Sequence, residues 1–171
     1  TGLRALQWNP AGMLAEKRSE IAFTHVEGFE DTDSEYFTLL YQRSEKTAYA
    51  LNLFANNINN IEFRTQPTAQ PEGIFGAHFF YGGLSYARRI GENYRIGFTG
   101  KYIYQKIYME NAAGFALDAG VRFAPPGKRY SAGFVLKNFG SMSELKNEST
   151  DLPALIRAGA AYRLPTGWNR Q

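Results

Sequence analysis

The residues of this sequence that could do acid–base or nucleophilic chemistry are few and scattered. Its two histidines are His25 and His78, and a hydrolase could use His78 with Ser85 and an acidic residue. No acid and nucleophile stand at a spacing that favours such a triad. The chain has no cysteine, which excludes thiol catalysis, disulfides and cysteine-ligated metals. We therefore expect no enzymatic activity, no cofactor and no metal site.

A second set of charged residues recurs in segments that alternate in polarity. In residues 94–105, Tyr94, Ile96 and Phe98 alternate with Arg95, Gly97 and Thr99. Successive side chains of a β-strand point to opposite faces, so each segment predicts a strand with one apolar face and one polar face that carries glycine and charge. The charges predicted on these polar faces form a candidate ionic network: Arg95, Lys101, Asp118, Arg122, Lys137 and Arg157. We expect Asp118 to lie near Lys101 or Arg122.

The length of these segments favours a membrane-spanning sheet. They reach the roughly 9–11 residues that a tilted transmembrane strand needs, whereas strands of a soluble sandwich average about 5–6. Aromatic residues gather near the segment ends, as in interfacial girdles. A charge facing lipid at mid-membrane costs about 2–4 kcal/mol for Arg or Lys, so the charged faces should line a lumen. A structural role for that network is the simpler interpretation, and a solute filter is the alternative.

Composition agrees with this interpretation. No run of about 20 apolar residues is present, and the mean hydropathy of −0.39 is compatible with strands in which every second residue meets lipid. The net charge is +3, with 19 basic and 16 acidic residues interspersed, which predicts no nucleic-acid partner. The fold class that we predict is all-β: a transmembrane antiparallel β-barrel.

Eight strands are expected, with tight turns at residues 44–45, 90–93, 110–111 and 124–128. Longer loops are expected at residues 27–34, 56–75 and 139–153. The last of these loops contains a glycosylation sequon at Asn147, which we interpret as accidental. The predicted strands span residues 19–26, 35–43, 46–54, 76–88, 94–109, 112–123, 130–138 and 154–164.

The first 18 residues are not strand-like and predict a separate hatch segment. Asn9 is a good helix N-cap, and Pro10 suits the first position of a helix that should run to about residue 15. Trp8, Met13 and Leu14 are too apolar to be left in water, so we expect the segment from residue 3 to 14 to pack inside the barrel or across its periplasmic mouth. Residues 1–18 are therefore predicted as a hatch, and residues 19–171 as strands of one barrel domain. The glycines at positions 97, 114, 120, 133 and 159 would leave space for the hatch inside the barrel.

The hatch motif, Trp8-Asn9-Pro10-Ala11-Gly12, resembles the Asn-Pro-Ala signature of the FadL-like outer-membrane barrels. Its longer form, Ala5-Leu6-Gln7-Trp8-Asn9-Pro10-Ala11-Gly12-Met13, is more similar to the PorV/PorQ branch. Further matches follow in order at residues 84–88, 97–103, 118–120, 136–140, 152–153 and 157–162. The resemblance therefore covers nearly the whole chain. It departs from the family at residues 1–4, where acidic residues usually stand, and the second half of the family's barrel is missing.

The resemblance implies a protein of the bacterial cell outer membrane that takes part in type IX secretion. Its partners would be outer-membrane lipid, other secretion-system proteins and secreted cargo, which it would dock or shuttle. The alternative is a FadL-like transporter of hydrophobic small molecules such as long-chain fatty acids. A soluble sandwich or lipocalin-like binder is the third interpretation. Residues 166–171 read as a turn, so we expect an incomplete portion of about eight strands, with further parts before and after it.

Overall fold

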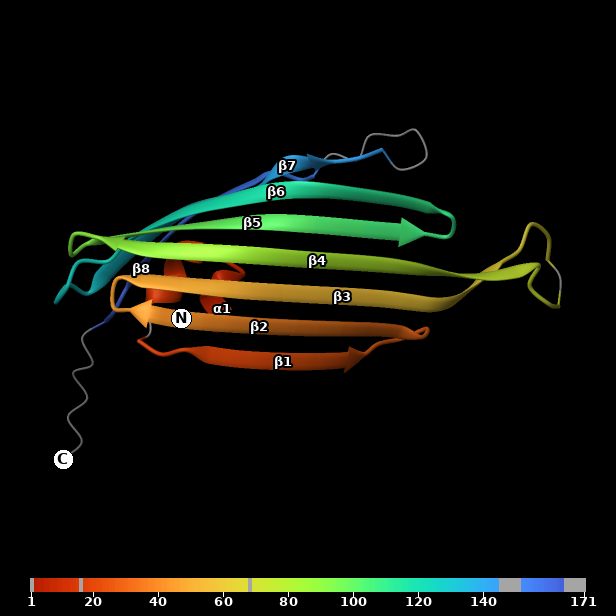
Figure 1. The fold of residues 1–171 in the computed structure, drawn as a ribbon, viewed down its shortest axis with the longest axis horizontal. Helices are drawn as coiled ribbons and strands as arrows, with labels where there is room; N and C mark the ends of the chain where they lie inside the picture. The colour runs from red at the N-terminus through yellow and green to blue at the C-terminus, as the bar shows by residue number, and fades with distance from the viewer. Residues whose placement is uncertain (1, 16, 68, 145–151, 165–171) are drawn as a thin grey trace, which may run out of the picture.

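The computed structural model describes residues 2–15, 17–67, 69–144 and 152–164, which form one antiparallel sheet of eight strands in sequence order (Figure 1). The fold is all-β with two short helices, as the alternating segments predict. No described strand pairs β1 with β8, so the sheet is open and these two strands are its edges. The strands are β1 (Glu20–Glu27), β2 (Thr32–Ser44), β3 (Thr47–Phe63), β4 (Gly73–Ile90), β5 (Tyr94–Ile107), β6 (Glu110–Phe123), β7 (Tyr130–Met142) and β8 (Leu155–Tyr162).

All three predicted loops are shorter than expected because the strands beside them are longer. β1 includes Glu27 and β2 starts at Thr32, so the loop predicted at 27–34 is confined to residues 28–31. β3 continues to Phe63 and β4 starts at Gly73, so the loop predicted at 56–75 is confined to residues 64–72. Asparagine is rare in strands, and the asparagines of residues 56–60 therefore resemble a loop in sequence. Cross-strand pairing overrides this preference, with a register shift between Ile58 and Ile61. β7 likewise extends to Met142, into the loop predicted from residue 139.

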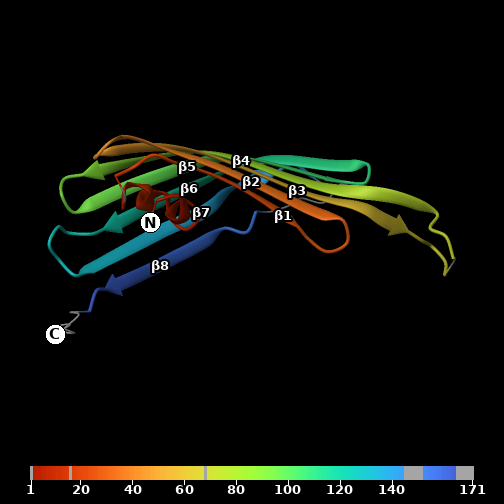
Figure 2. The same cartoon turned by 90° about the horizontal axis from the view of Figure 1, so that it is seen from below.

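The sheet curves strongly, and its two faces differ in chemistry (Figure 2). The apolar members of the alternating segments share the convex face, where Leu84, Phe115 and Leu117 are 59–71% exposed. One aromatic pair stands at the turn-side ends of β5 and β6 on this face, Tyr94 with Phe123 at 5.1 Å between ring centroids, and a second pair, Tyr102 with Phe115 at 5.4 Å, lies further along the same strands. The same face carries the other residues that the alternation places there, which are Ile96, Phe98, Val121, Phe134 and Ile156.

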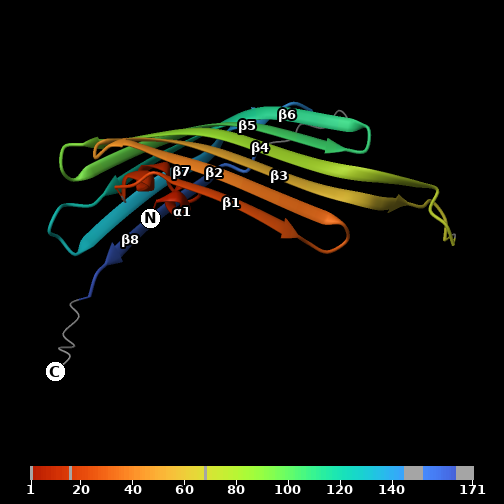
Figure 3. The ribbon, with the colours of Figure 1, turned by 60° about the horizontal axis from the view of Figure 1, so that its bottom comes forward.

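The two ends of the sheet differ in their connections. We call the end that holds residues 45–46, 91–93 and 124–129 the turn end, and the opposite end, which holds residues 28–31, 64–72 and 108–109, the loop end. The hatch segment lies on the concave face toward the turn end (Figures 2 and 3). It consists of α1 (Leu3–Leu6) and the 3-10 helix η1 (Pro10–Ala15).

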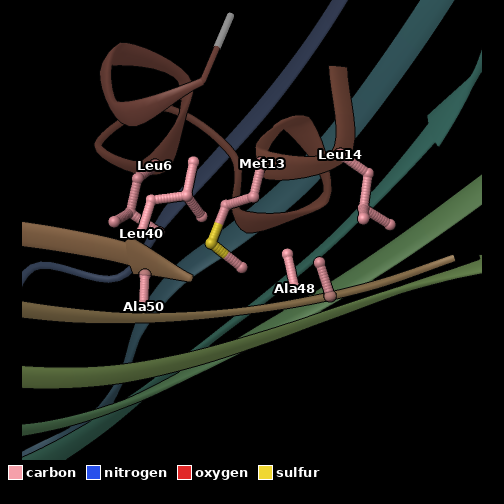
Figure 4. Close-up of a cluster of buried hydrophobic side chains, with 7 residues drawn as sticks. Leu6, Met13, Leu14, Leu40, Ala48 and Ala50 are labelled. Carbon is pink, nitrogen blue, oxygen red and sulfur yellow. The ribbon is translucent and has the colours of Figure 1, made fainter. Parts of the chain in front are cut away.

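The hatch packs on the sheet through a small apolar core (Figure 4). Leu6 and Met13 of the hatch lie beside Leu40 of β2, and Leu14 belongs to the same cluster on the far side of Met13; all four residues are at most 6% exposed. Small residues of β3 and β4 let the hatch approach the sheet at Ala48, Ala50 and Ala87. No helix among the described residues is long and apolar enough to cross a membrane.

Candidate functional site

Asn9 attaches the hatch to the sheet. Its side-chain nitrogen donates hydrogen bonds to the carbonyl oxygens of Val121 in β6, at 3.2 Å, and Phe134 in β7, at 3.1 Å. Its side-chain oxygen accepts one from the Ala11 backbone N–H at 2.9 Å, which is the N-cap that the sequence predicts for the helix starting at Pro10. One side chain thus caps η1 and joins it to two strands.

Two glycines create the space in which this contact forms. A Cβ on Gly97 would overlap the Ala11 nitrogen and the Pro10 carbonyl carbon, and a Cβ on Gly120 would overlap the Asn9 side-chain oxygen. A Cβ on Gly133 would make only ordinary contact with Asn9, and a Cβ on Gly159 would meet nothing within 4 Å. The predicted space for a hatch therefore rests on Gly97 and Gly120.

The remaining residues of the hatch motif divide between buried and exposed. Pro10 and Ala11 are buried, and Gly12 lies so close to Ala5 that a Cβ there would be 2.7 Å from the Ala5 Cβ. Trp8 differs from the prediction, since it is 62% exposed. The Arg157 guanidinium of β8 lies 5.0 Å from its ring centroid, within cation–π distance. The exposed ring therefore has a polar neighbour in place of the predicted apolar packing.

A buried ionic cluster occupies the middle of the concave face. The Asp118 carboxylate lies 2.5 Å from the Lys101 ammonium and 3.9 Å from that of Lys137. Asp118 and Lys101 are 3% and 8% exposed. Lys137 also donates a hydrogen bond to the Gln7 carbonyl oxygen, so this cluster contacts the hatch. Arg122, the other partner considered for Asp118, makes no ion pair with it.

Asn138 completes this cluster, and sequence reasoning did not identify its role. It lies where the β6–β7 register shifts, with a φ of 58°. Its backbone N–H donates to Asp118 at 2.8 Å, and its side-chain oxygen accepts from Lys101 at 2.8 Å. Asparagine tolerates this left-handed conformation better than most residues and is rare in strands. An asparagine near the end of a predicted strand was therefore the sequence signal that could have indicated the bulge.

A cavity of about 570 Å³ lies between the hatch and the sheet beside this cluster. Leu6, Phe54 and Tyr81 supply apolar and aromatic surface, and Lys101, Asp118 and Lys137 supply charge. Asn52 contributes a polar group that accepts hydrogen bonds from Tyr36 and Thr38 of β2. The cavity can therefore hold a polar or amphipathic group, with charge concentrated on one side.

The six charges predicted as one network occupy separate places. Lys101, Asp118 and Lys137 form the central cluster. Arg157 lies against Trp8. Arg95 and Arg122 are paired directly across β5 and β6 near the turn end. The network that the sequence predicts is thus a central cluster and a distinct arginine group.

The candidate hydrolytic residues do not meet. His78 and Ser85 stand an odd number of positions apart in β4, so their side chains point to opposite faces. The His78 Nδ1 atom contacts the Asn57 side-chain oxygen at 2.9 Å, and the Ser85 hydroxyl contacts the Thr99 hydroxyl at 2.8 Å. The described residues contain no group of three His, Asp or Glu side chains that could hold a metal. The sequon at Asn147 lies outside the described residues.

No protein-family model matches this chain, and no curated protein sequence matches it either.

Proposed function

We propose that this chain forms part of a hatch-closed β-barrel in the bacterial outer membrane, of the PorV/PorQ type within the FadL-like barrels. In this role it takes part in type IX secretion by docking or shuttling secreted cargo. The observation that carries the proposal is the attachment of the hatch motif to the sheet. Asn9 bonds to two strands at the place where Gly97 and Gly120 leave space for it. These are residues of the sequence pattern that resembles the family.

The two faces of the sheet support the membrane location. The convex face is apolar through the middle of the strands, and its charges stand toward the strand ends, at Glu35, Arg88 and Lys106. The concave face buries Asp118 with its lysine partners. An apolar outer band with aromatic ends and a polar interior is the arrangement of outer-membrane barrels. Closure into a barrel requires further pairing at the edges of β1 and β8.

Docking is favoured over solute passage because the hatch fills the concave face at the turn end. Its core side chains, Met13 and Leu14, are buried against the sheet, and Lys137 and Arg157 contact it from β7 and β8. A hatch held from several strands is suited to a closed lumen. Loops on a rigid scaffold commonly carry binding, so the β3–β4 loop would offer surface to a protein partner. In the second loop predicted for this role, at residues 139–153, residues 145–151 lie outside the described residues.

The second candidate is a FadL-like transporter of hydrophobic solutes. The specific observation in its favour is the cavity between hatch and sheet, where Leu6 and Phe54 lie near Lys101 and Lys137. An amphiphile with an anionic head could use both kinds of surface. Its walls are more polar than a long acyl chain prefers, since Thr24, Asn52 and Thr99 also line it.

A deletion strain separates the two candidates. We expect it to retain secreted cargo proteins in the periplasm while it takes up a fluorescent long-chain fatty acid at the normal rate. Complementation with Asn9→Ala should restore secretion less well than the wild-type gene, with Asn111→Ala, an exposed asparagine, as the matched control. Normal secretion together with a loss of fatty-acid uptake would contradict the docking role and favour the transporter.

A further inference from the structure

Three arginines lie on one cross-strand row at the turn end of the concave face. In the register of the sheet, Arg89 of β4 is opposite Arg95 of β5, and Arg95 is opposite Arg122 of β6. Directly opposed residues have Cβ atoms about 4.5–5.5 Å apart, and like charges in that position destabilise a sheet. The sheet therefore holds three guanidinium groups together against their mutual repulsion.

Further cations surround the same place. Arg129 and Arg163 are neighbours just beyond the ends of β7 and β8, where the Arg163 backbone N–H donates to the Arg129 carbonyl oxygen at 2.7 Å. A cavity of about 490 Å³ is lined by Arg95, Arg122, Lys128, Arg129 and Arg163, with Tyr130 and Ser131 at its side. We call this cavity the arginine pocket. It is separate from the cavity beside Asp118.

No carboxylate of the described residues lies within 4.0 Å of Arg95 or Arg122. Glu45 is close enough to Arg89 for their charges to attract, but it forms its own ion pair with Lys17 at 2.5 Å. The acidic group nearest in sequence, Glu92, offers Arg89 its backbone carbonyl at 3.1 Å. Lys101 on the same face is different, because the Asp118 carboxylate neutralises its charge.

Two hydrogen-bond donors of this row are buried and unused. The Nε atoms of Arg89 and Arg95 are out of contact with solvent, and no described residue accepts a hydrogen bond from them. A buried donor without a partner is unfavourable, and more so when the group is charged. Both the charge and the donors of the row are therefore unsatisfied within the described chain.

We propose that the arginine pocket binds a phosphate group. A phosphomonoester brings close to two negative charges and three acceptor oxygens in a compact volume, and guanidinium groups bind phosphate through paired hydrogen bonds. A single carboxylate carries one charge and would leave most of the five cations unmatched. The phosphate could belong to a soluble metabolite or to a phospholipid headgroup, since the aromatic residues Tyr94 and Phe123 stand at the same strand ends on the convex face.

The test is calorimetric titration of the full chain in detergent micelles at low salt. The soluble probe is glycerol 3-phosphate, and the lipid probe is phosphatidic acid added to the micelles, with diacylglycerol as its uncharged comparison. The variants are Arg95→Gln and Arg122→Gln. Arg88→Gln is the matched control, because Arg88 is exposed at the same end of β4 but lies on the opposite face from Arg89.

We expect a phosphate probe to bind the wild type and to bind Arg95→Gln and Arg122→Gln at least tenfold more weakly, with Arg88→Gln unchanged within twofold. Binding of glycerol 3-phosphate identifies a soluble ligand, and binding of phosphatidic acid alone identifies a headgroup. Thermal unfolding gives a second measurement. Without phosphate, Arg95→Gln should be at least as stable as the wild type because it removes like-charge repulsion. Phosphate should raise the unfolding midpoint of the wild type and of Arg88→Gln, and should raise that of Arg95→Gln less.

Four results would overturn the proposal. The first is binding of neither phosphate probe. The second is equal weakening by Arg88→Gln, which would indicate a general surface charge effect. The third is binding of a glutamate-rich peptide in preference to both phosphate probes, which would assign the arginine pocket to an acidic protein segment. A marked loss of stability in Arg95→Gln would also contradict it, since the arginine would then have a structural partner.

Discussion

At the scale of single residues, Asn9 does more than cap a helix, because it also binds the hatch to the sheet. It caps η1 through its oxygen and bonds to β6 and β7 through its nitrogen. No other natural side chain of that length offers both a donor and an acceptor except aspartic acid in its protonated form. Asn9 thus has a defined structural role at the start of η1.

Replacement of Asn9 by alanine should therefore loosen the hatch. The change removes an N-cap and two hydrogen bonds to strand carbonyls, which together are worth about 1–3 kcal/mol. We expect faster proteolysis between residues 2 and 18 in the folded protein, measured by limited digestion and mass spectrometry. Asn111→Ala should leave the digestion rate unchanged. Equal rates for wild type and Asn9→Ala would show that the apolar core alone holds the hatch.

Asp118 is the residue on which the central cluster depends. Replacement by asparagine keeps its size but leaves the buried Lys101 ammonium without its counter-charge, and such a loss is worth about 3–5 kcal/mol. Urea unfolding in detergent should show a lower midpoint for Asp118→Asn. The double variant Asp118→Leu with Lys101→Met removes both charges and should recover part of the loss. No recovery would indicate that Asn138 and Lys137 depend on the carboxylate independently of Lys101.

The Glu45 side chain links two elements, because it connects the β2–β3 turn to Lys17 near the end of the hatch segment. The hydrogen bond and the charge of Lys17 hold the pKa of the Glu45 carboxyl below its ordinary value. A carboxyl with a lowered pKa in the folded state contributes stability above its unfolded pKa, and this contribution is lost as pH falls through the lowered folded pKa. The link should therefore persist at neutral pH and open only in acid.

An NMR titration of the Glu45 side-chain carboxyl checks this expectation. In Lys17→Met the pKa of Glu45 should rise toward its ordinary value, whereas Lys46→Met should change it less. Both lysines flank the same turn, so the comparison separates the specific pair from the general charge of the region. An equal rise in both variants would mean that the Lys17 contact does not persist in solution.

At the scale of elements, the fit of the hatch to the sheet depends on backbone approach at two glycines. An alanine at position 97 would place its Cβ on the backbone between Pro10 and Ala11, neither of which is the flexible end of a side chain. Gly97→Ala should displace η1 and lower the thermal midpoint. Gly159→Ala is the matched control, because its Cβ meets nothing within 4 Å, and alanine in a strand is otherwise favoured by about 0.5–1 kcal/mol. Equal midpoints would place the hatch away from β5 in solution.

The alternation of side chains allowed the strands, and the face on which each side chain lies, to be predicted. It could not predict the hydrogen bonds between the sheet and the hatch. Phe98 and Leu117 lie on the convex face as the pattern predicts. The partners of Asn9 are backbone carbonyls, which no residue type marks in a sequence. The bulge at Asn138 shifts the register of β7 by one position, so strict alternation fails there.

The sequence also could not show that the six predicted charges divide into a central cluster and a separate arginine group. Arg95 and Lys101 share a face of β5, and both were predicted in one network. Six residues of a strand span about 20 Å, however, so charges that share a face do not all meet. Only the pairing register of neighbouring strands decides that Lys101 meets Asp118 while Arg95 meets Arg122.

At the scale of the whole molecule, the curved sheet has an apolar convex face and a polar concave face that carries the hatch. The contrast is clear between adjacent residues of β6, where Leu117 is 59% exposed on the convex face and Ala116 is 2% exposed on the concave face. A sheet with this exposed apolar area in water would aggregate through its face or its open edges. The proposed membrane location would resolve that difficulty, because lipid would cover the convex face.

Leu117→Arg therefore tests the membrane location with one side chain. An arginine facing lipid near the middle of the bilayer costs about 2–4 kcal/mol, so the variant should accumulate outside the outer membrane or fail to fold into lipid vesicles. Ala116→Ser, on the opposite face of the same strand, should insert normally. The measurement is the fraction of protein that resists extraction from outer-membrane vesicles by urea. Normal insertion of Leu117→Arg together with loss for Ala116→Ser would invert the facing of the sheet, and normal insertion of both would remove lipid as the partner of the convex face.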